Sequence, residues 1–177
     1  FAYFTFGAFS ALVYGMVALG GFLGDKILGT KRTIVIGLVS LALGYLALAL
    51  ANKQTVFIAL GLVCVGNGLF KANPSSLLAK CYEKNDARLH SGFTLYYMAI
   101  NLGSTFALFL GPYFAGHFGY AYAYFLSFIG LTLGLANYFF QKKHVAHINN
   151  EADTKPLKLS HWLLVISSIL FMSFLCA

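Results

Sequence analysis

The chain has 177 residues, of which 59% are hydrophobic and 10% are charged. Soluble domains carry roughly 25% charged residues and are less than half apolar, so this composition excludes a soluble globular protein and indicates an integral membrane protein. The formal net charge of +7 does not indicate nucleic-acid binding, because the basic residues lie in short loops between apolar segments rather than in one patch.

Six apolar segments follow one another along the chain, and a helix needs roughly 20 apolar residues to cross a bilayer. They are Phe1–Gly24, Thr33–Ala51, Thr55–Ala79, Ser91–Gly116, Tyr120–Phe140 and His161–Ala177. The first five are long enough to span. We expect an N-terminal membrane bundle over residues 1–140, a flexible cytoplasmic linker over 141–160, and the truncated start of a further membrane helix over 161–177.

The basic residues alternate between loops and predict the orientation of the segments. Ten of them lie at the first, third and fifth loops: Lys26, Lys31, Arg32, Lys80, Lys84, Arg88, Lys142, Lys143, Lys155 and Lys158. The even-numbered loops hold only Lys53. By the positive-inside rule the odd loops are cytoplasmic, and the first segment runs from outside to inside. We therefore expect a fragment that lacks an odd number of upstream helices, most simply one.

The third segment carries a charge in its middle, Lys71, and no acid. A lysine at this depth is costly and normally faces a bundle interior or a wet cavity. Asn67, Lys71 and Ser75 are four residues apart and would share one helical face. Pro74 should kink the helix just past the lysine. Lys71 has either a structural role, in which it pairs with an acid on another helix and fixes packing, or a functional role. Its partner is either an acid outside these segments or the carboxylate of a substrate.

Other polar residues inside the segments have weaker signals. Tyr97 and Asn101 are four residues apart on one face, and serve either a site or hydrogen bonds between helices. Tyr14 alone would be assigned to packing. Three small-x-x-x-small pairs predict close helix contacts. They are Gly20 with Gly24, Ala99 with Gly103, and Gly130 with Gly134.

Asp25 is an acid in the otherwise basic first loop. Such a carboxylate can cap a neighbouring helix or pair with Arg32, and so lock one state of a moving interface. His144, His147 and Glu151 lack a fourth ligand, and the three cysteines are widely separated, so we expect no metal site and no cofactor.

Three stretches together resemble one family. Residues 20–32, Gly-Gly-Phe-Leu-Gly-Asp-Lys-Ile-Leu-Gly-Thr-Lys-Arg, look like the cytoplasmic signature after the second helix of the major facilitator superfamily. Residues 66–76 and 93–104 resemble the fourth- and fifth-helix motifs of its proton-coupled oligopeptide transporters (POT/PTR). Residues 81–86 are similar to the bacterial dipeptide and tripeptide permease branch. The resemblance implies helices two to six of a twelve-helix core, followed by the start of an inserted helix.

The resemblance also implies roles for individual residues. Lys71 would engage the peptide carboxylate and take part in proton coupling. The remaining candidates are the substrate contacts Tyr14, Tyr97 and Asn101, and the conformational latch residues Asp25, Lys26 and Arg32. Lys26 stands where many members have arginine, which keeps the charge but loses bidentate pairing.

The implied function is proton-driven symport of di- and tripeptides by alternating access. The implied protein is a cofactor-free monomer in the lipid bilayer of the bacterial cytoplasmic (inner) membrane. Three alternatives stay open. A facilitator of nitrate or another small organic anion would differ in its first helix. An intramembrane enzyme would need more charged groups than Lys71 at depth. A membrane scaffold would tolerate Lys71→Gln.

Overall fold

The computed structural model describes residues 2–52, 55–83, 85–148, 151–154, 156 and 159–176. All secondary-structure elements of these described residues are helices or helical turns. The elements are α1 (Ala2–Leu23), the π-helical turn η1 (Gly24–Leu28), α2 (Thr30–Ala49), α3 (Val56–Lys71), α4 (Asn73–Lys80), α5 (Arg88–Phe118), α6 (Tyr120–Gln141), the 3-10 turn η2 (Lys142–Val145), α7 (Glu151–Thr154) and α8 (Leu159–Cys176). The predicted all-α fold is confirmed.

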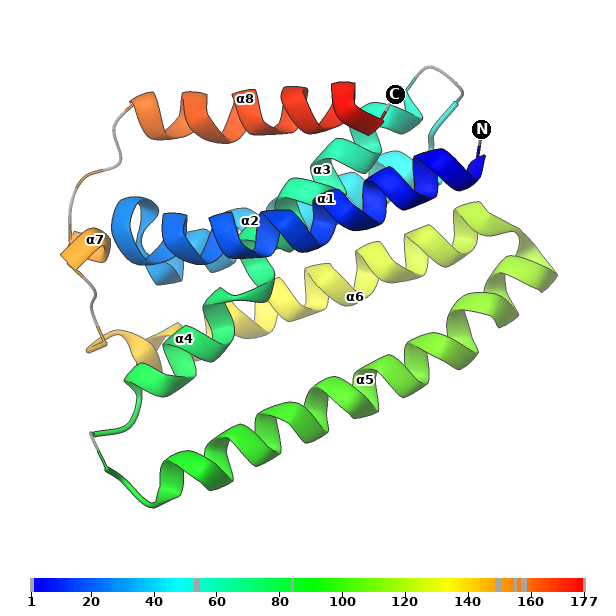
Figure 1. Cartoon of the computed structure of the whole chain (residues 1–177). Helices are drawn as coiled ribbons and strands as arrows, with labels where there is room; N and C mark the ends of the chain where they lie inside the picture. Colours follow the sequence, from blue (N-terminus) through cyan, green and yellow to red (C-terminus); the bar gives the residue numbers. More distant parts are fainter. Residues whose placement is uncertain are drawn as a thin grey trace.

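Six helical stretches of the described residues are long and apolar enough to cross a membrane, and they correspond to the six predicted segments. They are Phe9–Leu28, Thr30–Ala49, Val56–Lys80, Arg88–Phe118, Tyr120–Val145 and Leu159–Cys176. The loops that follow α1, α4 and α6 gather at one end of the bundle, and the other connections lie at the opposite end (Figure 1). This arrangement agrees with the alternation predicted from charge, although Lys53, Lys84, Lys155 and Lys158 lie outside the described residues.

Local chemistry explains where several helices begin and end. Gly29 and Gly119 have φ angles of 89° and 98°, which glycine adopts without strain, and they separate η1 from α2 and α5 from α6. At the start of α5, the Asp86 carboxylate accepts hydrogen bonds from the Arg88 backbone N–H at 2.9 Å and from the Arg88 guanidinium at 2.8 Å. The Arg88 side chain thereby lowers the pKa of the Asp86 carboxyl.

Helix α3 lies at the centre of the bundle and packs against α1, α2 and α8 (Figure 1). Its buried side chains include Ala59, Val63, Cys64, Val65 and Leu69. Helices α5 and α6, by contrast, have no buried residue within the described chain, and α5 packs mainly along α6. The position of α3, which carries Lys71, is therefore fixed on three sides.

Glycines set the closest approach in the bundle, between α1 and α3. A Cβ atom added to Gly20 would collide with the backbone carbonyl of Gly68, and one added to Gly24 would collide with the Asn73 side chain. This confirms the packing face predicted from Gly20 and Gly24. The other two predicted pairs differ: a Cβ at Gly103, Gly130 or Gly134 would meet no described atom within 4 Å. Small-residue spacing alone does not distinguish the two cases, since it says nothing of what lies opposite.

The described part of the predicted flexible linker is structured and docked. Ile148 and Ala152 are 9% and 2% exposed. The Lys31 backbone N–H donates to the Asp153 carboxylate at 3.3 Å, and Lys31 Nζ donates to the Ala146 carbonyl at 3.3 Å. Asp153 also lies against Gly29, where any side chain would collide with it. The described residues between α6 and α8 therefore cover the junction of η1 and α2.

Substitution of Gly20 by alanine tests the α1–α3 contact. Because the added methyl group would meet backbone rather than a flexible side chain, we expect Gly20→Ala to lower the free energy of unfolding by about 1–3 kcal/mol. The measurement is chemical unfolding of the full-length protein in mixed micelles. Gly15→Ala on the same helix is the matched control, since a Cβ there meets no described atom within 4 Å. Equal effects of the two substitutions would contradict this packing.

Candidate functional site

Lys71 is the last residue of α3, at a break in the third membrane segment. Ala72 forms the turn, and α4 begins at Asn73 with Pro74 in its first turn. Proline has no backbone N–H to donate to the preceding turn, and it is tolerated where a helix starts. The Ala72 N–H donates to the Phe70 carbonyl and closes the end of α3. The break predicted just past the lysine is therefore confirmed.

The Lys71 ammonium lies over the ring of Tyr14, with Nζ 4.8 Å from the ring centroid. Tyr14 is on α1, which packs beside α3, so the structure brings together two candidate residues that are 57 positions apart. Such a cation–π contact contributes about 0.5–1 kcal/mol when exposed and about 2 kcal/mol or more when desolvated. Tyr14 is 70% exposed within this chain. The pair thus presents one positive charge and one aromatic face to the space outside α1 and α3.

The ion pairs within the described chain join Lys80 to Asp25 and Arg88 to Asp86. Neither involves Lys71. The Lys71 side chain is exposed within the described chain, where its charge faces an aromatic ring rather than a carboxylate. This geometry leaves the ammonium able to receive an anionic group.

The predicted single face of Asn67, Lys71 and Ser75 is interrupted. Because the helix breaks at Ala72, the regular four-residue spacing does not continue from Lys71 to Ser75. Both polar side chains bond to nearby backbone: Asn67 Nδ2 donates to the Val63 carbonyl at 3.0 Å, and Ser75 Oγ donates to the Ala72 carbonyl at 2.9 Å.

Tyr97 and Asn101 lie on α5, which packs along α6 and has a shorter contact with α4. The Tyr97 ring is 56% exposed and lies 5.6 Å from the Tyr96 ring and 6.3 Å from the Phe93 ring. Asn101 is also exposed within the described chain. The structure does not bring these two residues against Tyr14 and Lys71, so their part in the same site stays a prediction.

Asp25 lies in η1 and forms an ion pair with Lys80, where the sequence suggested either a helix cap or a pair with Arg32. Its Oδ1 accepts from Lys80 Nζ at 2.8 Å, Ser76 Oγ at 3.3 Å and Thr30 Oγ1 at 3.4 Å. Lys80 Nζ also donates to Thr30 Oγ1 at 3.0 Å. The partner is Lys80 because α4 brings its C-terminal end against η1. This cluster ties α4 to the connection between α1 and α2.

Sequence reasoning missed Lys80, which it assigned only to membrane topology. A usable signal existed: residues 73, 76 and 80 recur at helical spacing after the break and share one face of α4. Of the other two predicted latch residues, Lys26 is exposed and Arg32 is half-buried.

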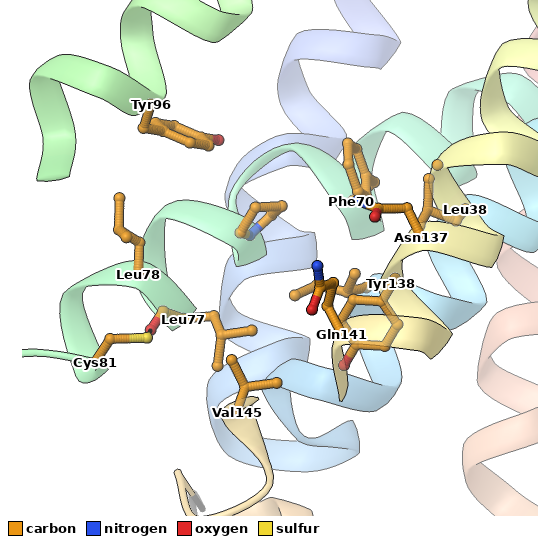
Figure 2. A pocket seen from close by; sticks show the side chains of 13 residues that line it. Leu38, Phe70, Leu77, Leu78, Cys81, Tyr96, Asn137, Tyr138, Gln141 and Val145 are labelled. Atoms are coloured by element: carbon orange, nitrogen blue, oxygen red, sulfur yellow. Dashed lines mark hydrogen bonds between the residues drawn. The ribbon is translucent and has the colours of Figure 1, made fainter. Parts of the chain in front are cut away.

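A separate cavity of about 410 Å³ lies between α2, α4, α5 and α6. It is lined by Ile34, Leu38, Phe70, Pro74, Leu77, Leu78, Cys81, Tyr96, Gly134, Asn137, Tyr138, Gln141 and Val145. Figure 2 shows Tyr96 reaching in from α5, with Asn137 and Gln141 on α6. The walls are mostly apolar and include no predicted site residue. The cavity is therefore distinct from the Tyr14–Lys71 pair.

Comparisons with known proteins agree with the family resemblance of residues 20–32, 66–76 and 93–104. A protein-family model described as POT family matches residues 31–173. The chain is 52% identical over 178 aligned positions to dipeptide and tripeptide permease B of Salmonella typhimurium, covering 99% of this chain and 36% of that protein.

Two solved structures share the fold. A crystal structure of tetrameric PepTSo2 matches with a TM-score of 0.87 and 36% identity, over 97% of this chain and 40% of that one. A structure described for substrate recognition in proton dependent oligopeptide transporters matches with a TM-score of 0.81 and 34% identity, over 97% and 40%. The chain therefore spans little more than a third of the length of the relatives that it matches.

A double-mutant cycle tests the Asp25–Lys80 ion pair. The two side chains are 45% and 33% exposed, so we expect Asp25→Asn and Lys80→Met to show a coupling energy of only about 0.2–1 kcal/mol. The coupling should fall at high salt. It is measured from unfolding free energies of the full-length protein in micelles. Lys143→Met, which changes an exposed lysine of η2, should show no coupling with Asp25→Asn. A coupling of zero at low salt would contradict the pair.

Proposed function

We propose, from the premise that this chain belongs to the POT family, that the full-length protein is a proton-coupled symporter of di- and tripeptides. The observation that carries the proposal is the Lys71 ammonium, held at a helix break inside a membrane segment with an aromatic ring beside it. Support comes from the relative named a dipeptide and tripeptide permease and from the structure described for proton dependent oligopeptide transporters. In this proposal the protein is a transporter rather than an enzyme, and it needs no cofactor.

Lys71 supplies the charge that a short peptide requires. Every unmodified peptide ends in a carboxylate, and an ammonium in a low-dielectric surrounding attracts that group far more strongly than it would in water. The Tyr14 ring holds the ammonium in place from one side. Tyr97 and Asn101 would complete the pocket by hydrogen bonds from α5.

Proton coupling follows from competition for the same ammonium. In one state Lys71 pairs with a carboxylate from another part of the full-length protein. Protonation of that carboxylate removes its charge, so the lysine is released to hold the peptide carboxylate. After the peptide leaves, the acid loses its proton and the ion pair forms again. The proton thus biases two conformations by differential affinity, as alternating access requires.

The Asp25–Lys80 cluster would stabilise one of the two conformations. It joins α4, which begins two residues after Lys71, to η1 at the end of α1. A pair that is one-third to one-half exposed is weak enough to break and form during a transport cycle. We include Lys26 and Arg32 in this latch.

The surroundings of the protein belong to the same proposal. We place it in the bacterial cytoplasmic (inner) membrane, with the connections after α1, α4 and α6 inside the cell. We propose that a single copy transports peptide. PepTSo2, which shares the fold, is described as tetrameric, so assembly of such proteins is compatible with this architecture.

Uptake of labelled dialanine into liposomes tests the function. The full-length protein should accumulate dialanine when the inside is alkaline, and Lys71→Ala should reduce the uptake at least about tenfold, since it removes the only charge on the described substrate-facing surface of α3. Lys143→Ala is the control for loss of a lysine away from α3. Uptake that does not depend on the proton gradient would contradict the proposed proton coupling. No uptake by the folded wild type would exclude dipeptides and favour another small anion such as nitrate.

Tyr14 variants test whether the aromatic face matters. Because the ring of phenylalanine also attracts a cation, Tyr14→Phe should keep the KM for dialanine within about threefold of the wild-type value. Tyr14→Leu removes the ring and should raise the KM by about threefold to tenfold. Concentration-dependent uptake measures both. Equal KM values for Tyr14→Leu and the wild type would show that the contact contributes nothing to binding.

A further inference from the structure

One buried amide spans the helix break beside Lys71. Asn73, the first residue of α4, is 1% exposed. Its Nδ2 donates to the Leu69 carbonyl of α3 at 2.6 Å and to the Gly20 carbonyl of α1 at 3.1 Å. A single side chain thus joins three elements: the end of α3, the start of α4 and α1 near its C-terminal end.

These bonds require an amide nitrogen. Both partners are carbonyl oxygens, which only accept, so the side chain must present two N–H donors at this point. The amide oxygen then has no hydrogen-bond partner among the described residues. It faces Gly24, where any side chain would collide with it. A buried acceptor without a partner destabilises a fold. The two hydrogen bonds that the amide nitrogen donates are thus formed although the amide oxygen stays without a partner among the described residues.

The two hydrogen bonds of Asn73 fix the backbone on both helices that carry the Tyr14–Lys71 pair. The bond to Leu69 fixes the turn that contains Lys71, two residues before the asparagine. The bond to Gly20 fixes that turn against α1, six residues along the helix from Tyr14. At 1.5 Å per residue this is roughly 9 Å along one rigid helix. The positions of the ring and the ammonium are therefore set by the same amide.

We propose that Asn73 is a positioning residue, which holds the Lys71 ammonium against the Tyr14 ring by bonding the helix break to α1. It acts through Lys71 and touches no peptide itself. The proposal rests on the proposed function only for its effect on transport, because the geometry that Asn73 maintains is present without substrate.

A spectroscopic experiment tests the geometry without any transport measurement. Lysines of the full-length protein are converted to ¹³C-dimethyllysine, which keeps the positive charge, and the Lys71 signal is identified by its loss in Lys71→Arg. An ammonium over a ring experiences the ring current, so the Lys71 methyl signal should lie upfield of the lysines that have no ring beside them, Lys142 over the Phe139 ring being excepted. Asn73→Leu, which is close in size but has no donor, should return the signal to the common lysine position.

Ser40→Val is the matched control. Ser40 Oγ donates to the Leu62 carbonyl of α3 at 2.9 Å, so it is also a buried side chain that bonds α3 across a helix interface, but this interface is with α2 rather than with α1, which carries Tyr14. It should lower the melting temperature without moving the Lys71 signal. If Asn73→Leu does not fold, Asn73→Ala replaces it, because the smaller side chain also has no donor and adds no bulk at the buried position.

Two results would overturn the proposal: an upfield Lys71 signal that stays in place in the Asn73 variant, or a wild-type signal without an upfield shift. Dialanine uptake gives the second readout. We expect the Asn73 variant to raise the KM by about threefold to tenfold with little change in kcat, and Ser40→Val to leave the KM unchanged. A lower kcat at unchanged KM would indicate a general structural role and contradict positioning. If the wild type takes up no dialanine, the peptide proposal fails while the spectroscopic result still decides the role of Asn73.

Discussion

The backbone contact between α1 and α3 is the constraint on which the other features depend. Gly20 and Gly68 let the two helices approach so closely that no side chain fits between them. In a bilayer, where apolar side chains gain little by leaving lipid for protein, such close packing and hydrogen bonds hold helices together. The contact places Tyr14 over Lys71 and brings the Gly20 carbonyl within reach of Asn73. The candidate site is therefore a product of helix packing rather than of a separate loop.

Features that arise within one segment could be predicted from the sequence. Apolar length predicted five spans and the start of a further helix, loop charges predicted which connections share one end, and Pro74 predicted the break past Lys71. Each follows from local chemistry: hydrocarbon thickness, the cost of charge in lipid, and a missing N–H. The assignment of Lys71 and Tyr14 to one site needed the family resemblance, because spacing within a segment does not say which helices are neighbours.

Features that join two segments could not be predicted in this way. Asp25 forms an ion pair with Lys80, 55 residues later, and this pairing depends on the direction that α4 takes after the break. Asn73 reads as a polar residue next to a proline until α1 is placed beside it. Likewise, the same small-residue spacing occurs on α1 and on α6, yet only the first faces another helix closely within the described chain.

The break at Ala72 also affects how this chain enters a membrane during synthesis. A lysine near the centre of a helix adds about 2.5–3.5 kcal/mol to the apparent free energy of insertion, and a proline two residues into α4 weakens the helix further. The stretch from Val56 to Lys80 is thus a weaker insertion signal than α2 before it, which holds no charge beyond its first turn. We infer that the third segment enters the bilayer together with α1 and α2, so that early helix pairing is part of biogenesis as well as of the folded state.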